Sequence, residues 1–452
     1  MAGFAWLVWA IIHVYLLVGF QHRLQVSIQW LWRYLACERG ARLVAEEHIV
    51  QNGSILKRPP GIAEEDRSAA RILTSTSGLR NDCNARRLCL VSPGMRTMRE
   101  ESLDFLKRIV STPSPSGFEQ PVAQLYRDYV TPFAHKVTTD VMGNVMAVIN
   151  PDAPMRVMYA GHMDEIGFIV HYIDEDGFLF FSPIGGTDAA TEIGQRVLVH
   201  GRESVPGVLG RKAIQTFGAA DTSQTPPLKD LWIDIGATSR EDAEKVVKVG
   251  SPVTIDAGFS LLRGNHAVGR AFDNKVGLMI GADLARCLSE EGGVHPNVGI
   301  YILGTVQEEI GSRGAKTAAF NIAPRTALAI DMGVAMDYPR ARPEEQGKLD
   351  LGKGPGISQG ANTNPVVYDL LISAARQKKI PFQKQATGAT SPTDAREVQV
   401  TQGGIATGII SVPLRYMHTP SEVMCLADVQ ATIDLVCEYC RRIRPDTDFT
   451  PW

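Results

Sequence analysis

The chain has 452 residues, which is enough to bury a large core and, by length alone, to form two or three domains. Charged residues make up 21% of the sequence and hydrophobic residues 44%, with 42 glycines, a composition typical of an ordinary α/β protein. The formal net charge of −3 and the lack of a basic block argue against a nucleic acid or an anionic membrane surface as the partner.

The N-terminal segment allows three interpretations. The run from Ala2 to Phe20 has no formal charge and is long enough to span a bilayer, and the arginines that follow it would then keep the rest of the chain cytoplasmic. Alternatively, residues 1–94 belong to an over-long reading frame, because Met95 and Met98 stand directly before a regular amphipathic pattern. A buried helix is the third interpretation. We therefore treat residues 1–94 as an N-terminal extension.

The folded part is expected to begin near Met98, with a first helix over Glu101–Ser111 and a second over Phe118–Tyr129. Short apolar runs then alternate with helical segments. The expected strands are Val145–Ile149, Met155–Ala160, Val298–Thr305, Thr326–Ile330 and Ile405–Ser411. The expected helices are Asn274–Glu290, Ser312–Phe320, Pro365–Gln377, Thr393–Gln399 and Ala427–Arg441. This alternation predicts an α/β domain with a mostly parallel central sheet that helices cover on both faces.

The pattern changes between about His171 and Gly264. Apolar runs in this stretch are short, punctuated by glycine and rich in β-branched residues, and only one helix is expected, near Ser239–Val247. We interpret residues 171–264 as a small β-rich domain inserted into the α/β domain. The latter is thereby divided into residues 95–170 and 265–452.

Acidic and histidine residues gather in five places, each just after an apolar run or at the start of a helix. They are His162-Met163-Asp164, Asp273-Asn274, Glu308-Glu309, Asp331 and His418. Each cluster alone has an ordinary explanation, such as a helix cap or a solvated turn. Because parallel α/β sheets present ligands at the carboxyl ends of their strands, we expect the five to meet in one crevice.

Two imidazoles and several carboxylates are the ligand set of a hydrolytic site with two divalent ions. One carboxylate can bridge the ions, and a further carboxylate that is not a ligand can move the proton of the attacking water. The adjacent Glu308 and Glu309 can supply both functions. Asp164 is placed to fix the tautomer of His162, and Asp273 is expected to cap the helix that begins at Asn274.

The seven cysteines show no framework spacing. Cys437-x-x-Cys440 stands alone at helical spacing, with no second pair, and we interpret it as packing. This usage of cysteine suits a reducing compartment, so a cytoplasmic location is expected.

The candidate site residues stand in six characteristic segments or near them. These are Tyr159–Val170 (YAGHMDEIGFIV), Gly269–Gly277 (GRAFDNKVG), Thr305–Ala315 (TVQEEIGSRGA), Ala329–Gly333 (AIDMG), Gly352–Ile357 (GKGPGI) and Val412–Val423 (VPLRYMHTPSEV). Taken together, these segments resemble the M42 metallopeptidases, the glutamyl-aminopeptidase-like enzymes of the tetrahedral (TET) type. The resemblance covers about three quarters of the chain, from Met98 to about Arg441, and leaves out residues 1–94.

The resemblance implies a zinc-peptidase-like fold and a metal-dependent aminopeptidase acting on short peptides. It implies that one metal ion is bound by His162, Asp273 and Asp331, and the other by Asp273, Glu309 and His418. Asp273 would then bridge the ions, Glu308 would be the general acid/base and Asp164 would orient His162. Zinc, cobalt and manganese are all compatible with such mixed nitrogen and oxygen ligands.

The family also implies self-assembly, in which dimers combine into a dodecamer. The inserted domain resembles the PDZ-like dimerisation domain of the family, and its place between His162 and Asp273 separates the chain from M20-type dipeptidases and deacylases. One stretch departs from the pattern. After Gly207–Gly210 the family usually continues with a Lys-Pro-Pro-His-like segment, whereas this chain has Arg211–Gln215 (RKAIQ), so the contribution of the insert to oligomer contacts stays open.

Three rival interpretations remain. Gly356–Gly360 (GISQG) matches the nucleophile-elbow pattern of a serine hydrolase, with Ser358 as nucleophile and Asp394 and His418 following in the α/β-hydrolase order. Such an elbow needs a strand immediately before the serine, and the Gly-rich segment here predicts a loop. The other two are an inactive, membrane-tethered binding protein and a metal hydrolase that cleaves another bond.

Overall fold

The computed structural model describes residues 97–213 and 225–451. The predicted extension, residues 1–94, and the candidate anchor within it therefore lie outside the described residues. Across the two described ranges, no helix combines the length and the apolar character needed to cross a membrane.

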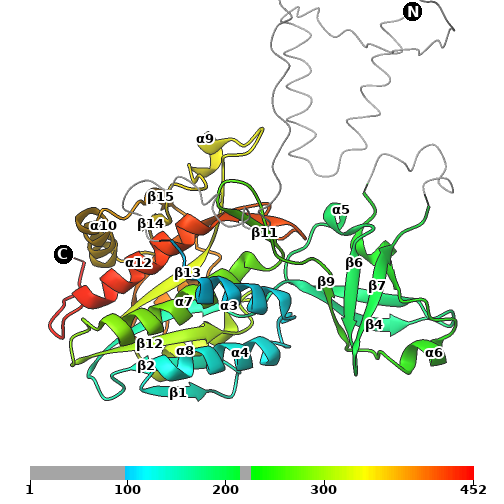
Figure 1. Ribbon diagram of the computed structural model, residues 1–452, viewed down its shortest axis with the longest axis horizontal. Helices are drawn as coiled ribbons and strands as arrows, with labels where there is room; N and C mark the ends of the chain where they lie inside the picture. The colour runs from blue at the N-terminus through cyan, green and yellow to red at the C-terminus, as the bar shows by residue number, and fades with distance from the viewer. Residues whose placement is uncertain (1–96, 214–224, 452) are drawn as a thin grey trace, which may run out of the picture. The chain divides into compact units, whose positions relative to one another are not determined.

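An eleven-stranded sheet forms the centre of the α/β domain (Figure 1). Its main path runs in the order β1 (Lys136–Thr139), β2 (Val145–Ile149), β12 (Val298–Thr305), β3 (Met155–His162), β13 (Thr326–Val334), β16 (Ala406–Arg415), β17 (Glu422–Cys425), β11 (His266–Gly269) and β10 (Ser260–Leu261). Strand β14 (Gly356–Gly360) pairs with β16 and with β15 (Gln383–Thr387).

The sheet is mixed, so the prediction of a mostly parallel sheet was too strong. The four central strands β12, β3, β13 and β16 are parallel. The other strands of the main path pair antiparallel, among them β1 with β2 and β17 with β11, whereas β15 pairs with β14 in parallel. The connection from β1 to β2 is a short turn, and a crossover to a parallel strand would need a dozen or more residues.

Helices cover both faces of the sheet. One face packs against α3 (Glu100–Ser111), α4 (Gln120–Val130), α7 (Phe272–Glu291), α10 (Pro365–Lys378) and α12 (Leu426–Arg442). The other face packs against α8 (Arg313–Ile322) and α11 (Ala395–Gln399). Two shorter helices, η1 (Thr131–Phe133) and α9 (Pro343–Gln346), lie in connections.

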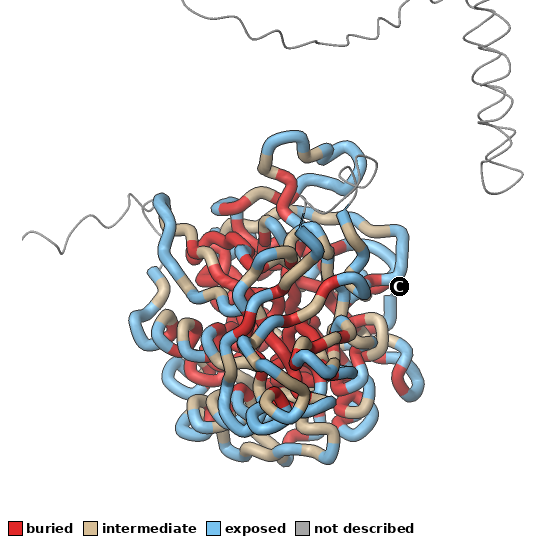
Figure 2. Tube along the Cα trace, turned by 90° about the vertical axis from the view of Figure 1, so that its right-hand side faces the viewer, coloured by how far each residue is buried: buried red, intermediate tan, exposed pale blue. Residues whose placement is uncertain are grey.

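Strand β3 illustrates why both faces are buried. Val157 and Tyr159 point into the core beneath α7, while Met158 and Ala160 point into the core beneath α8, because side chains alternate along a strand. Figure 2 shows the buried residues gathered in the interior of the fold. Cys437 and Cys440 are both buried in the core beneath α7, in agreement with the packing interpretation.

The inserted domain is a closed six-stranded barrel, which confirms the prediction of a small β-rich insertion. The barrel order is β4 (Gly167–Ile173), β5 (Leu179–Ile184), β8 (Trp232–Asp234), β7 (Ser204–Gly210), β6 (Arg196–His200) and β9 (Pro252–Ile255). The expected helix is α6 (Arg240–Glu244), and η3 (Leu228–Asp230) and α5 (Ala189–Glu192) were not predicted. Helix α5 has only four residues, too few to show a helical repeat in the sequence.

The sheet opens where two of its central strands separate. Strand β13 pairs with β3 only as far as Ala329 opposite Ala160, and beyond this point it stays paired with β16 alone. Strand β3 stays paired with β12 up to His162 opposite Thr305. The carboxyl ends of β3 and β13 therefore diverge, and this split positions the site.

Candidate metal centre

His162 and Asp331 lie on the two sides of this split. His162 is the last residue of β3, and its Nε2 atom is 3.7 Å from Oδ1 of Asp331. The sequence placed Asp331 after the end of its strand, which was wrong. Strand β13 continues to Val334 because its pairing with β16 extends that far, so Asp331 projects from within a strand.

Asp273 lies between the two imidazoles. Its Oδ1 atom is 3.3 Å from Nε2 of His162, and its Oδ2 atom is 3.5 Å from Nε2 of His418. The prediction that Asp273 is the N-cap was wrong, because Asn274, also non-helical, is the residue whose Oδ1 accepts the N–H of Gly277 at 2.9 Å and caps the following turns of α7 (Phe272–Glu291). Asp273 itself has non-helical dihedrals (φ −79°, ψ 105°), which turn its carboxylate out of the first helical turn.

Glu308 and Glu309 follow β12 and face different imidazoles. Oε2 of Glu308 is 3.8 Å from Nε2 of His162, whereas Oε2 of Glu309 is 3.5 Å from Nε2 of His418. The preceding residue, Gln307, has a positive φ of 57°, which sets the turn that separates the two carboxylates. Ser312 donates a hydrogen bond of 3.1 Å from Oγ to Oε1 of Glu308.

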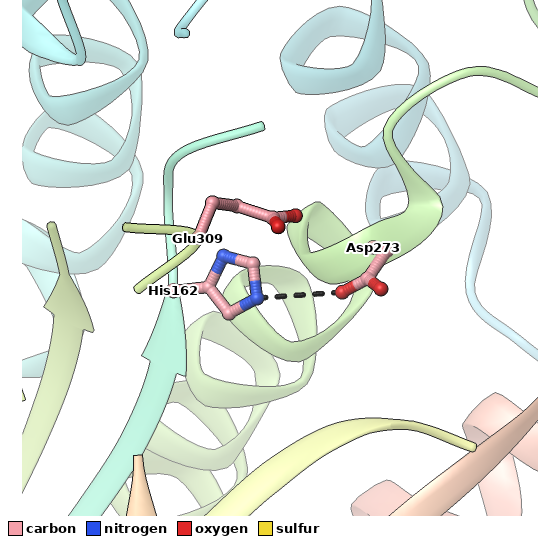
Figure 3. Close-up of side chains that lie close together, drawn as sticks. All are labelled: His162, Asp273 and Glu309. Atoms are coloured by element: carbon pink, nitrogen blue, oxygen red, sulfur yellow. Dashed lines mark ion pairs between the residues drawn. The ribbon is translucent and has the colours of Figure 1, made fainter. Parts of the chain in front are cut away.

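The resemblance to the M42 family assigns the ligand candidates to two overlapping sets. We name them the first half-site (His162, Asp273 and Asp331) and the second half-site (Asp273, Glu309 and His418). Figure 3 shows how His162 at the end of its strand, Asp273 at the start of α7 and Glu309 from its loop turn toward one another. These three offer ligand atoms that all lie within 4.8 Å of one another, an arrangement able to hold a metal ion.

The cluster has more negative charge than its protein surroundings neutralise. Burial raises the pKa of Glu308 to about 9 and that of Glu309 well above its usual range. Burial alone would lower the pKa of His162, but the surrounding aspartates outweigh this effect and raise it. Oε1 of Glu309 is buried without a hydrogen-bond partner among the described residues. Divalent cations would supply the missing charge, and imidazole and carboxylate are ligands they accept, so the residues present fit such ions.

Asp164, the predicted orienting residue, lies beside the ring of His162. Nδ1 of His162 is 3.1 Å from the backbone carbonyl oxygen of Asp164 and 3.4 Å from its Oδ1 atom. A proton on Nδ1 leaves the lone pair of Nε2 directed toward Asp273 and Asp331. The carboxylate of Asp164 is completely buried and also accepts a hydrogen bond of 2.7 Å from Oγ of Ser116, a residue that the sequence did not single out.

Glu422 is a second residue that sequence reasoning missed. Its buried carboxylate accepts the backbone N–H of His418 at 2.9 Å and that of Asp273 at 3.2 Å. Its position four residues after His418 was a local signal, but the contact with Asp273 joins distant parts of the chain.

A comparison with protein families identifies the chain. The M42 glutamyl aminopeptidase family matches residues 143–435, a range that contains both half-sites. The chain belongs to the M42 peptidase family. It is accordingly a hydrolase of the aminopeptidase type, and the resemblance read from the sequence motifs is confirmed.

Relatives of this M42 peptidase match it over most of their length. It is 35% identical over 361 residues to a lysyl aminopeptidase of Pyrococcus furiosus, covering 77% of this chain and 99% of the relative. Its fold is similar to that of a TET aminopeptidase from a Thaumarchaeota archaeon, with a TM-score of 0.74, 32% identity and coverage of 77% and 98%. The TET1 peptidase of Pyrococcus horikoshii, 27% identical with a TM-score of 0.68 over 76% of this chain and 100% of its own, assembles into a tetrahedron or a large octahedral shell.

The M42 peptidase does not assemble the serine triad considered from its sequence. Ser358 lies inside β14 and not on a sharp turn between a strand and a helix. Asp394 accepts a hydrogen bond of 2.7 Å from Thr305, while Nε2 of His418 faces Asp273 and Glu309. Within the described ranges, no hydrogen bond or ion pair joins Ser358, Asp394 and His418 to one another.

Proposed function

We propose that this M42 aminopeptidase works with two divalent ions, one in each half-site, and that Asp273 bridges them. The observation that carries the proposal is the position of Asp273, whose two oxygens each face a different histidine. When bound, such ions lower the pKa of a water molecule and polarise the carbonyl of the scissile bond. Zinc fits the mixed ligands, and cobalt and manganese are also compatible.

Glu308 is the proposed general acid/base. Its Oε2 atom faces the first half-site from the turn after β12, and Ser312 holds the other oxygen. In this position Glu308 accepts the proton of the attacking water and delivers it to the leaving amine. Asp164 keeps His162 in the tautomer that directs Nε2 into the site.

The proposed substrates are short peptides with a free N-terminus.

The proposed quaternary structure is a homo-oligomer in which dimers combine into a dodecamer, with the inserted barrel as a PDZ-like dimerisation module. Support for assembly comes from the fold it shares with the TET1 peptidase of Pyrococcus horikoshii. Light scattering after size-exclusion chromatography measures the number of subunits. The proposed location is the cytoplasm.

The test of activity is hydrolysis of aminoacyl-anilides and short peptides, each with a free or an N-acetylated terminus. The full chain is assayed before and after chelation, and again with zinc, cobalt or manganese restored. We expect cleavage that needs the free terminus, stops with the chelator and returns with a metal ion. The Glu308→Gln variant should bind metal but lose about 10²- to 10⁴-fold in kcat.

Glu345→Gln, a change on the exposed helix α9, is the matched control and should keep wild-type rates. Equal cleavage of blocked and free substrates would contradict the aminopeptidase activity. Activity that persists after complete removal of metal would contradict the proposed mechanism.

A further inference from the structure

The backbone of the second half-site is held by a carboxylate that is not itself a ligand candidate. Glu422 is the first residue of β17 and is 2% exposed. One of its oxygens accepts the N–H of His418 at 2.9 Å, and the other accepts the N–H of Asp273 at 3.2 Å. A single side chain therefore sets the distance between the backbones of two residues from distant parts of the sequence.

His418 needs such support because of its backbone conformation. Its φ is +59°, in the left-handed region that residues with a Cβ atom adopt at a cost in free energy. The hydrogen bond from its N–H to Glu422 holds the peptide in this conformation. The imidazole is thereby presented toward Asp273 and Glu309.

The ring of His418 lies against the inserted barrel. Its Nδ1 atom is next to the turn between β5 and α5, since a Cβ atom added at Gly186 would lie 3.5 Å from it. The other ring nitrogen, Nε2, faces Asp273 and Glu309. The turn therefore borders the side of the ring that faces away from the other ligand candidates.

The same turn lies directly against Glu309. Gly185 has a φ of +76°, and a Cβ atom at this position would lie 3.3 Å from Cβ of Glu309 and 2.8 Å from Cγ2 of Ile166. The turn approaches this closely only because residue 185 has no side chain. The barrel thus contributes to the site, although it offers none of the ligand candidates.

We propose that Glu422 and the Gly185–Gly186 turn are the positioning groups of the second half-site and determine how tightly it binds its ion. The inference rests on the proposed function, because it presupposes an ion in each half-site. The first half-site depends less on these groups, since His162 and Asp331 are held by β3, β13 and Asp164.

The first experiment compares Glu422→Gln with the wild-type full chain. Gln keeps the size of the side chain but replaces one acceptor oxygen by an NH2 group, which cannot accept either backbone N–H. Metal-free protein is titrated with zinc or cobalt by calorimetry, and bound metal is counted by mass spectrometry. We expect the ion of the second half-site to bind about 10- to 100-fold more weakly, with a much smaller change in affinity for the ion of the first half-site. The control variant is Glu438→Gln, which makes the same change at another buried glutamate, on α12.

The second experiment uses two glycines of the barrel with similar backbone conformations. Gly185→Ala places a Cβ atom against Ile166 and Glu309, whereas Gly194→Ala, at a φ of +79°, meets nothing within 4 Å. Both glycines have a similar positive φ, so the difference between the two variants reports mainly the contact with the half-site. We expect weaker binding of the second ion in Gly185→Ala and wild-type binding in Gly194→Ala.

The outcomes separate this inference from the proposed function. In one outcome the wild-type chain binds two ions, and the Glu422→Gln and Gly185→Ala variants bind both ions with wild-type affinity. This outcome overturns the positioning roles but leaves the two-ion proposal intact. In another outcome, Glu422→Gln weakens the binding of both ions equally and lowers the melting temperature of the metal-free protein. Glu422 then has a merely structural role, and the inference is also overturned. A wild-type chain that binds fewer than two ions overturns the two-ion proposal itself.

Discussion

The carboxylate of Asp164 accepts a hydrogen bond from the backbone N–H of Glu308 at 3.0 Å. Its other oxygen accepts the N–H of Glu309 at 3.1 Å and the hydroxyl of Ser116 at 2.7 Å. The residue that lies beside Nδ1 of His162 therefore also holds the backbone of the turn that carries the two glutamates. One buried side chain couples a ligand candidate of the first half-site to the general acid/base candidate.

Replacing this carboxylate should affect both metal binding and catalysis. In Asp164→Asn, one oxygen becomes an NH2 group that faces backbone N–H donors, so at least one of the hydrogen bonds to the glutamate turn is lost. We expect about 10- to 100-fold weaker metal binding and a fall in kcat larger than any change in KM. Calorimetry and steady-state kinetics measure the two effects. Asp104→Asn, which changes an exposed ion pair with Lys107, is the control. Wild-type kcat at saturating metal would contradict the positioning role.

Metal binding should release protons at pH 7. In the metal-free chain, burial raises the pKa of Glu308 to about 9, and the surrounding carboxylates overcome the effect of burial and raise the pKa of His162. Both groups therefore hold a proton at pH 7, whereas a bound ion favours neutral imidazole and ionised carboxylate. We expect at least one proton released per subunit and an affinity that rises from pH 6 to pH 8. Calorimetry in buffers of different ionisation enthalpy measures this number, and a value of zero would contradict the prediction.

A buried ion-pair cluster beside the site should make stability depend on acid pH. Glu165 accepts hydrogen bonds from Lys275 at 2.8 Å, from the N–H of Ser114 at 2.7 Å and from Arg270. Burial would raise the pKa of Glu165, but the two cations outweigh it and lower the pKa from 4.5 to about 2. Because the folded pKa lies below the unfolded one, this stability is present above about pH 4.5 and is lost as the pH falls toward 2.

The shift corresponds to about 3 kcal/mol at pH 7. Glu165→Gln should therefore lower the free energy of unfolding of the metal-free chain by roughly that amount at pH 7 and much less near pH 2.5. Urea unfolding at several pH values measures the difference. Glu175→Gln, which removes an exposed partner of Arg240, should cost about 1 kcal/mol or less. A loss for Glu165→Gln that is independent of pH would show that the ion pairs are not its cause.

Close contact between β3 and α7 should be sensitive to a single methyl group. A Cβ atom at Gly161, the residue before His162, would lie 2.7 Å from the carbonyl carbon of Gly277 in the first turns of α7. Gly161→Ala must push the helix that carries Asp273 away from the strand that carries His162. We expect a loss of about 1–3 kcal/mol in the free energy of unfolding and weaker metal binding.

Thermal unfolding and calorimetry measure the two effects of Gly161→Ala. Gly258→Ala is the matched control, because a Cβ atom there meets nothing within 4 Å. It should leave the stability unchanged or raise it slightly, since alanine restricts the unfolded chain. Wild-type metal affinity in Gly161→Ala would contradict the proposed link between this contact and the site.

The sequence alone predicted the elements whose signal is local. Val145–Ile149 and Val298–Thr305 match β2 and β12 residue for residue, because buried central strands are continuous apolar runs. The candidate ligands were also recognisable, since each is a polar residue just after an apolar run or at the start of a helix. The directions of the outer strands were not, because a β-propensity is the same in parallel and antiparallel pairs.

Only the tertiary structure decided how these residues meet. The sequence determined which side chains are available for an ion and roughly which element carries each. That β13 leaves β3 after Ala329, that Glu422 joins Asp273 to His418, and that the barrel turn at Gly186 lies beside the His418 ring all depend on contacts between distant segments. Such contacts form because buried polar groups must find partners in the folded chain, and no local pattern specifies which partner lies nearby.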